Sequence, residues 1–275
     1  NLHHTLVDCI VFWSKNPEPL IGYLDLINEM KYKYYFQFTI TPYDNAIEKA
    51  LPNKNEIQKT FSKLSKKIGK EKVIWRYDPI ILNEKLTIKY HVNEFAKMAT
   101  GLSDYTNECI ISFVDPYRKS LRQMGKNLMR DITEAEMDDI ANNFSDIAKK
   151  TGLTLKTCAE EIDLGKYGIE HASCIDRNKI EDIINCSLSD KAKKDGQRKG
   201  CRCIECIDVG AYNTCKNNCL YCYATFSHEA TTNNCKNHDP SSPLLIGQPT
   251  SNDKLSERKV ITLKDPSTQL SMYLE

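Results

Sequence analysis

The feature that most constrains the fold of this chain is a repeated alternation of short apolar runs with longer helical patterns. The apolar runs are nearly continuous and rich in β-branched and aromatic residues, as in parallel strands that are buried on both faces. They occupy residues 8–13, 34–40, 72–75, 109–114 and 153–157. Apolar residues at helical spacing fill the stretches between them, over residues 19–30, 56–68, 91–102 and 132–150. The alternation predicts βα units and an α/β fold with a parallel sheet.

Polar and charged residues follow the predicted strands at the points where the strands end. Asp78 directly precedes Pro79 and Arg76 lies two residues before Asp78, while Glu160 follows another strand by a few residues. Proline ends regular structure, and (β/α) barrels build their sites at the carboxyl ends of their strands. We therefore expect an incomplete TIM-like (β/α) barrel with a site on that rim. Arg76 and Glu160 would contact a cofactor or substrate there, or would belong to an arginine–carboxylate network that stiffens the rim.

Cysteine is unusually frequent in this chain and unevenly distributed. The sequence of 275 residues contains 12 cysteines, and seven of them lie between residues 201 and 235. A disulfide scaffold would be small, loop-rich and secreted, whereas the first part of this chain has the periodicity of a packed core. Clustering of this kind favours metal ligation in a reducing cytoplasm. We expect a (β/α) barrel core over residues 1–163 and a cysteine-rich iron–sulfur segment over residues 164–275, packed on the barrel rim within one structural domain.

The densest motif of the sequence has C-x3-C-x2-C spacing, with Tyr221 directly before its last cysteine. Its members are Cys215, Cys219 and Cys222. Three thiolates on one short loop can hold three corners of a [4Fe–4S] cluster and leave the fourth iron open for a substrate or cofactor. The alternative is a zinc knuckle, completed by one further thiol or imidazole. The candidates for that fourth ligand are Cys206, Cys235 and His238.

This spacing resembles the cluster motif of the radical S-adenosylmethionine enzymes. In that superfamily three cysteines hold the cluster, and the unique iron binds the amino and carboxylate groups of S-adenosylmethionine. For this chain the resemblance implies a [4Fe–4S] cluster on Cys215, Cys219 and Cys222, S-adenosyl-L-methionine as a cofactor, and an electron donor such as a flavodoxin or a ferredoxin. Tyr221 would pack near the adenine or over the cluster. No motif specifies the substrate, whether it is a small molecule or a macromolecule.

A longer resemblance covers essentially the whole chain. The stretch over residues 197–224 and the strand exits at residues 11–17, 36–39 and 75–79 are similar to a bacterial family, domain-of-unknown-function family 1848. Residues 238–247 also resemble it. The resemblance implies a radical-SAM-like cluster placed late in the chain rather than after the first strand of a barrel. It also implies a further N-terminal strand, which we expect this sequence to lack.

Four other cysteines form a second constellation, Cys158, Cys174, Cys201 and Cys203. Cys158 lies at the exit of a predicted strand. Cys201 and Cys203 are one residue apart and need distant partners to close a metal site. We expect a second metal site here, either an auxiliary iron–sulfur cluster or zinc. The alternative is that these are free buried cysteines that pack as small hydrophobic residues.

Charge and hydropathy narrow the class of function. The net charge of +1 provides no overall field for nucleic acid or an anionic membrane. No apolar run reaches the length of about 18 residues that a membrane helix needs. From the cysteine motif and the resemblances it carries, together with this charge and hydropathy, we expect a radical S-adenosylmethionine-type enzyme of the cytoplasm with no membrane partner. Two alternatives stay open: a non-catalytic barrel that binds zinc or an iron–sulfur cluster, and a nucleic-acid repair enzyme of the lyase type.

Overall fold

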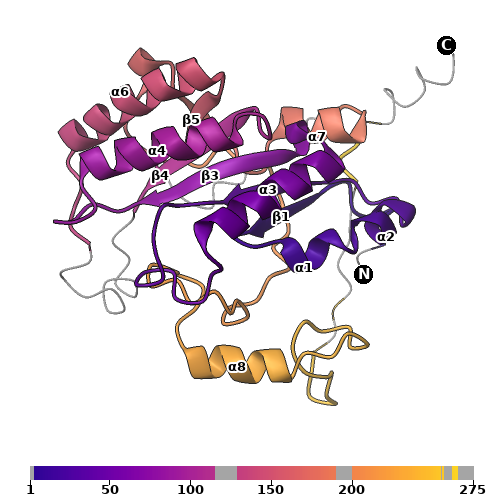
Figure 1. Ribbon diagram of the computed structural model, residues 1–275. Helices are drawn as coiled ribbons and strands as arrows, with labels where there is room; N and C mark the ends of the chain where they lie inside the picture. The colour runs from indigo at the N-terminus through magenta and orange to yellow at the C-terminus, as the bar shows by residue number, and fades with distance from the viewer. Residues whose placement is uncertain (1–2, 115–128, 190–199, 255, 257–261, 266–275) are drawn as a thin grey trace, which may run out of the picture.

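The centre of the protein is a parallel β-sheet, seen in a computed structural model that describes residues 3–114, 129–189, 200–254, 256 and 262–265 (Figure 1). The strands lie in the sheet in the order in which they occur in the sequence, and each pairs in parallel with the next. They are β1 (Ile10–Ser14), β2 (Tyr34–Thr39), β3 (Val73–Ile80), β4 (Glu108–Phe113), β5 (Thr154–Cys158) and β6 (Glu170–Ala172). All carboxyl ends therefore lie at one end of the sheet.

All five predicted strands are present, and a sixth extends the sheet. β6 is three residues long and pairs with β5. The sequence pattern misses it because its residues, Glu-His-Ala, form no apolar run. The six-stranded parallel sheet confirms the α/β class. No pairing joins β1 to β6 among the described residues, so the sheet is open there and the predicted barrel is not confirmed.

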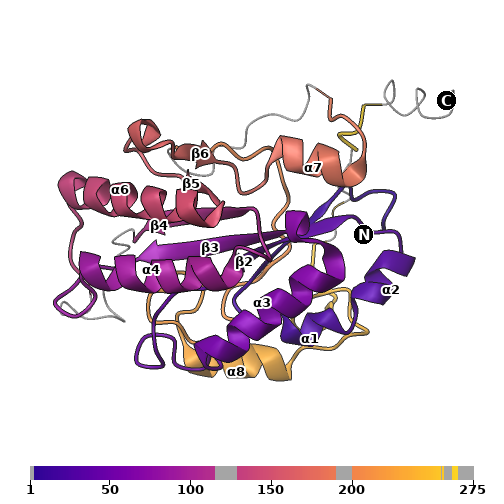
Figure 2. The ribbon, with the colours of Figure 1, turned by 45° about the horizontal axis from the view of Figure 1, so that its top comes forward.

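A layer of three helices covers one face of the sheet. α3 (Lys54–Ile68), α4 (Ile88–Leu102) and α6 (Glu134–Thr151) lie side by side in Figures 1 and 2. Right-handed crossovers between sequential strands place their helices on the same side, which accounts for the single layer. The last of these helices begins with a capping box formed by Thr133 and Glu136, and it is followed by Gly152, which adopts the left-handed conformation with φ 73°.

The remaining helices of the described residues are shorter. They are α1 (Glu18–Ile21), α2 (Leu24–Glu29), α7 (Arg177–Ile184) and α8 (His228–Lys236), with 3-10 turns η1 (Lys70–Lys72) and η2 (Gly165–Tyr167). The prediction of one helix over residues 19–30 is wrong, because the chain forms two short helices separated by Gly22 and Tyr23, where Tyr23 N bonds Leu20 O (2.9 Å) in a tighter turn. α8 is missed because no apolar stripe marks its sequence, and in Figure 1 it lies apart from the sheet. Within the described ranges, no helix is long and apolar enough to cross a membrane.

Aromatic side chains fill the space between the sheet and the helical layer. Trp75 and Tyr77 of β3 point to this side and are fully buried. Both rings contact Phe95 of α4, which stacks on Phe144 of α6 with ring centroids 3.9 Å apart. This cluster joins three elements and forms the centre of the main core.

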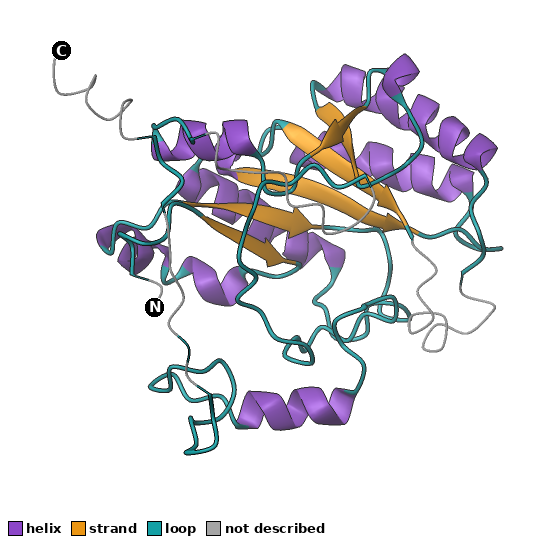
Figure 3. Cartoon of the chain, turned by 180° about the vertical axis from the view of Figure 1, so that it is seen from behind, coloured by secondary structure: helices purple, strands orange, loops and turns teal. Residues whose placement is uncertain are grey.

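The opposite face of the sheet packs against the later part of the chain. Tyr35, Ile74 and Ile110 point to this face and belong to a cluster with Ile180 of α7 and with Ile204. Figure 3, seen from behind, shows loops rather than a layer of helices crossing this face. The central strands β2, β3 and β4 are therefore buried on both sides, as their apolar sequences predict, whereas β1 and β6 at the edges are more exposed.

Candidate metal centres at the carboxyl ends of the strands

The three-cysteine loop, residues 215–222, docks beside the carboxyl end of β2. Cys219 forms an isolated antiparallel bridge with Glu48, in the segment that follows β2. A further backbone hydrogen bond runs from Leu220 N to Ile47 O (3.0 Å). The loop is thus attached at the end of the sheet where parallel α/β proteins build their sites.

Glu48 is a buried carboxylate that holds this loop. Its side chain is 1% exposed and forms ion pairs with Lys15 (2.8 Å) and Lys54. It also accepts hydrogen bonds from the hydroxyl groups of Thr41 (2.7 Å) and Tyr221. Burial alone would raise the pKa of Glu48, but the two lysines lower it to about 2. The carboxylate is therefore ionised at neutral pH and is a fixed anchor for the loop.

Tyr221, which we predict to contact a cofactor, is part of that anchor. Its ring packs edge-to-face on Tyr43, with centroids 6.0 Å apart, and Lys15 Nζ lies 5.4 Å from its centroid. Burial raises the pKa of Tyr221 well above its ordinary value, so the hydroxyl stays protonated and donates to Glu48. The side chain orients the last turn of the three-cysteine loop, and its contact with a cofactor stays a prediction.

The three cysteines of the loop differ in exposure. Cys219 is buried, Cys222 is half-buried and Cys215 is exposed. Burial raises the pKa of Cys219 to about 12, while the nearby charge of Lys15 acts in the opposite direction. The thiol of Cys219 is therefore in the protein interior, and those of Cys215 and Cys222 lie nearer the surface.

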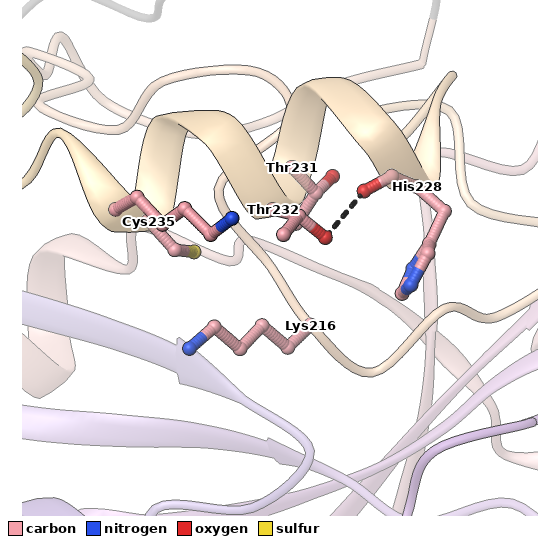
Figure 4. Close-up of a pocket in the computed structure, with 6 residues that line it drawn as sticks. Lys216, His228, Thr231, Thr232 and Cys235 are labelled. Atoms are coloured by element: carbon pink, nitrogen blue, oxygen red, sulfur yellow. Dashed lines mark hydrogen bonds between the residues drawn. The ribbon is translucent and has the colours of Figure 1, made fainter.

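Cys235 of α8 lies next to the loop and donates its thiol to the carbonyl of Thr214 (3.5 Å). Of the three candidates for a fourth zinc ligand, Cys235 is the one beside the loop. Cys206 packs with the second cysteine set, and the His238 ring contacts the carbonyl of Leu245 (2.9 Å). Figure 4 shows the shallow hollow of about 250 Å³ that borders Cys235. Its lining residues are Lys216, His228, Thr231, Thr232, Cys235 and Lys236.

The second cysteine set, Cys158, Cys174, Cys201 and Cys203, comes together near the carboxyl ends of β5 and β6. The Sγ atoms of Cys158 and Cys174 lie 2.9 Å apart. Cys174 also hydrogen-bonds Cys203, which in turn contacts Cys201. All four are free cysteines. As the side chains stand, no group of three or more His, Cys, Asp or Glu residues in the described part of the chain surrounds a metal position.

Hydrogen bonding favours thiolates within the second cysteine set. The bond with Cys174 and the charge of Arg76 outweigh burial and lower the pKa of Cys158 to about 6. The pKa of Cys203 falls to about 5, chiefly through its bond with Cys174, whereas the pKa of Cys174 itself rises. Hydrogen bonding with Cys174 thus shifts Cys158 and Cys203 toward the thiolate form, which is the form that binds metals.

Arg76 projects from β3 toward the second cysteine set and is 3% exposed. Its guanidinium donates to Asp78 Oδ2 (2.6 Å) and to Cys174 Sγ (2.9 Å). Asp78 also accepts a hydrogen bond from Ser112. Burial would raise the pKa of Asp78, but Arg76 and Ser112 lower it. This placement fits the predicted arginine–carboxylate network, and direct contact of Arg76 with a cofactor stays a prediction.

Glu160 lies at the same end of the sheet, where its Oε1 accepts a hydrogen bond from Phe113 N (2.8 Å) and so ties the exit of β5 to the end of β4. The predicted site residues thus form two groups, one beside β1 and β2 and one beside β5 and β6.

A family model matches most of this chain. It is described as a domain of unknown function (DUF1848) and matches residues 1–224. The chain belongs to this family. The DUF1848 match contains the three-cysteine loop and the second cysteine set, and it ends before Cys235 and before residues 238–247. No curated protein and no solved structure matches the chain.

Two residues of this DUF1848 site, Lys15 and Glu48, are missed by the sequence pattern. Lys15 directly follows β1, so it occupies the same kind of strand exit as the residues after β3. Its place at a strand exit is the sequence signal that could have identified Lys15 as a site residue. Glu48 lies in an irregular segment with no motif, and nothing in the sequence marks it.

Proposed function

We propose that this protein is a radical S-adenosylmethionine-type enzyme in which the three-cysteine loop holds a [4Fe–4S] cluster. The observation that carries the proposal is the anchoring of this loop at the carboxyl ends of parallel strands, through Glu48. Sites of parallel α/β proteins are built at that end. Strict sequential strand order also supports the interpretation of the sheet as an incomplete (β/α) barrel, because each strand of such a barrel pairs with the next.

The donor set fits an open cluster. Cys215, Cys219 and Cys222 supply three thiols on one short loop, which is enough for three irons and leaves one iron without a cysteine from the motif. When bound with S-adenosylmethionine, such a cluster supplies one electron for cleavage of the sulfonium and release of a 5′-deoxyadenosyl radical. Burial raises the pKa of Cys219, and the positive charge of Lys15 offsets part of that rise, so Lys15 would help to stabilise the thiolate that a cluster requires.

Other side chains of this end of the sheet would orient the ligands. Lys15, Glu48 and Tyr221 hold the loop in place. In the arginine–carboxylate network, the Asp78 side chain is 27% exposed and that of Arg76 only 4%. A ligand amine would therefore meet Asp78, and Arg76 would act through it as a positioning residue. Glu160 would orient the neighbouring exit in the same way, through Phe113.

A second candidate function has its own supporting observation. Because Cys235 lies beside the three-cysteine loop, four thiols are available in this part of the chain. Four cysteines form a closed tetrahedral zinc site with no position for a substrate. The protein would then be a non-catalytic metal-binding member of its family.

One experiment separates these functions. The full chain is reconstituted anaerobically with iron and sulfide, reduced, and incubated with S-adenosylmethionine, and 5′-deoxyadenosine is measured by mass spectrometry. We expect product from the wild-type protein and from Cys235→Ser, but none from Cys219→Ser. A cluster-loaded wild-type protein that yields no 5′-deoxyadenosine would exclude the enzymatic proposal. Loss of one zinc ion per chain from Cys235→Ser and from Cys219→Ser, measured before reconstitution, would favour the closed zinc site.

A further inference from the structure

We infer that the second cysteine set binds a single structural zinc ion, which fastens the segment after residue 200 to the open edge of the sheet. The four thiols come from three places: Cys158 ends β5, Cys174 follows β6, and Cys201 and Cys203 lie on a later loop. A tetrahedral site of four cysteine thiolates is the standard closed arrangement of structural zinc. The inference does not depend on the function of the three-cysteine loop.

Backbone geometry brings the later loop close to the exit of β5. Gly200, directly before Cys201, has φ +78°, and an added Cβ there would lie 3.3 Å from the carbonyl oxygen of Glu160 and 3.5 Å from the carbonyl carbon of Ala159. Ala159, directly after Cys158, also has a positive φ of 54°. Glycine at position 200 permits both the positive φ and the close approach to the backbone of residues 159 and 160. The two chain segments therefore meet directly beside Cys158 and Cys201.

Hydrogen bonds around the set resemble the outer shell of a metal site. Ile175 N donates to Cys203 Sγ (3.3 Å), and Arg76 Nη1 donates to Cys174 Sγ (2.9 Å). The carbonyl of Cys174 accepts from Tyr35 Oη (2.7 Å) and Gln37 Nε2 (3.0 Å). Ligand thiolates and their backbone are thus oriented by groups that do not bind the metal themselves. Zinc with four thiolates is a net anion, and the buried guanidinium offsets part of that charge.

Distances between the thiols favour one ion over a cubane cluster. Two thiolates on one tetrahedral zinc lie about 3.8 Å apart, given zinc–sulfur bonds of about 2.3 Å. The 2.9 Å between Cys158 and Cys174 is shorter, so the ion would spread these side chains by about 1 Å, which small χ1 rotations allow. In a [4Fe–4S] cluster each cysteine binds a different iron, so the thiolates lie farther apart.

The zinc ion would join the end of β5, the segment after β6 and the later loop, which little regular secondary structure holds together. β6 is three residues long and is the edge of the open sheet. Beyond it, hydrogen bonds from Ile204 N to Ile175 O (3.1 Å) and from Ser173 Oγ to the carbonyl of Arg202 (2.9 Å) attach the later loop. A metal bound to β5, to the segment after β6 and to this loop would fix the path that leads to residues 215–222. Metal binding of this kind contributes directly to folding.

Metal analysis of the full chain tests the inference. The protein is purified anaerobically from cells supplied with iron and zinc, and both metals are counted by mass spectrometry. We expect about one zinc per chain, bound by sulfur alone at about 2.3 Å in X-ray absorption at the zinc edge. Cys158→Ser/Cys174→Ser and Cys201→Ser should lower zinc content about tenfold or more. Cys206→Ser, a nearby cysteine outside the set, should keep the zinc.

A further variant separates the two centres. Cys215→Ser/Cys219→Ser/Cys222→Ser should lose iron and keep zinc, so zinc in a protein without iron would support this inference while the proposed function fails. Zinc that disappears with the loop cysteines would overturn the inference, as would iron that survives their removal. A Cys158–Cys174 disulfide in metal-free wild-type protein would also overturn it. If Cys158→Ser/Cys174→Ser does not fold, the zinc content of Cys201→Ser, which changes a half-buried side chain, and the X-ray absorption spectrum of the wild-type protein still test the inference.

Discussion

Replacement of Glu48 by glutamine tests how firmly the three-cysteine loop is held. The substitution keeps the size of the side chain but removes the buried charge that faces Lys15 and Lys54. The pKa of Glu48 is lowered from 4.5 to about 2, which corresponds to about 3 kcal/mol of net favourable interaction. Loss of one partner from a buried ion pair costs about 3–5 kcal/mol. The lysine side chains are 14% and 26% exposed and can turn toward water, so we expect a loss of about 2–3 kcal/mol.

Urea unfolding of the cluster-free protein measures this loss, followed by tryptophan fluorescence, which changes on unfolding because Trp75 is fully buried and Trp13 is half exposed. The matched control is Glu18→Gln, which breaks an exposed pair with Lys63 and should change the free energy of unfolding by less than about 0.5 kcal/mol. Hydrogen exchange at Leu220 N, which bonds Ile47 O, detects opening of the loop by itself. A Glu48→Gln variant as stable as the control, with unchanged exchange at Leu220, would refute the reasoning.

Three further results are expected from buried or conformationally restricted residues. Burial lowers the pKa of His91 to about 4. The unfolded chain therefore binds more protons than the folded chain between about pH 6.5 and 4, and the free energy of unfolding falls by up to about 3 kcal/mol as the pH is lowered through that window. His91→Gln should flatten this part of a plot of unfolding free energy against pH. Gly200→Ala should lower the melting temperature in calorimetry more than Gly168→Ala, because both have positive φ but only at Gly200 would the new Cβ meet backbone atoms; equal shifts would contradict this. Phe144→Ala removes a fully buried ring stacked on Phe95 and should cost about 3–5 kcal/mol in urea unfolding, whereas a loss below about 1 kcal/mol would mean that the core refills the space.

Strands were the most predictable part of this fold, for a physical reason. A strand covered on both faces must be apolar at nearly every position, and such a run is visible in the sequence. β4 is of this kind, with every residue buried. β6 is different, because its three residues become a strand through pairing with β5 and not through their own composition. The break between α1 and α2 depends likewise on a local turn that the apolar spacing does not encode.

Parts of the candidate site were predictable and parts were not. The cysteines could be singled out because their residue type and spacing are rare, and Cys158 because a strand ends at it. The contact of Cys174 with Cys158 depends on the pairing of β5 with β6, which no spacing reveals. Glu48 is still less accessible to prediction, since an isolated glutamate in a loop is usually exposed. Its burial depends on three separate segments that close around it.

The contact between Tyr221 and Glu48 has a consequence for how the protein is made. The two residues are 173 positions apart in the sequence, and chains are synthesised from the N-terminus at about 5–20 residues per second. Much of the sheet would leave the ribosome before the first thiol of the three-cysteine loop exists. Iron could therefore load only at a late stage of synthesis or after it. A ribosome-bound fragment that stops before residue 215 should already protect the amides of β2 and β3 from hydrogen exchange.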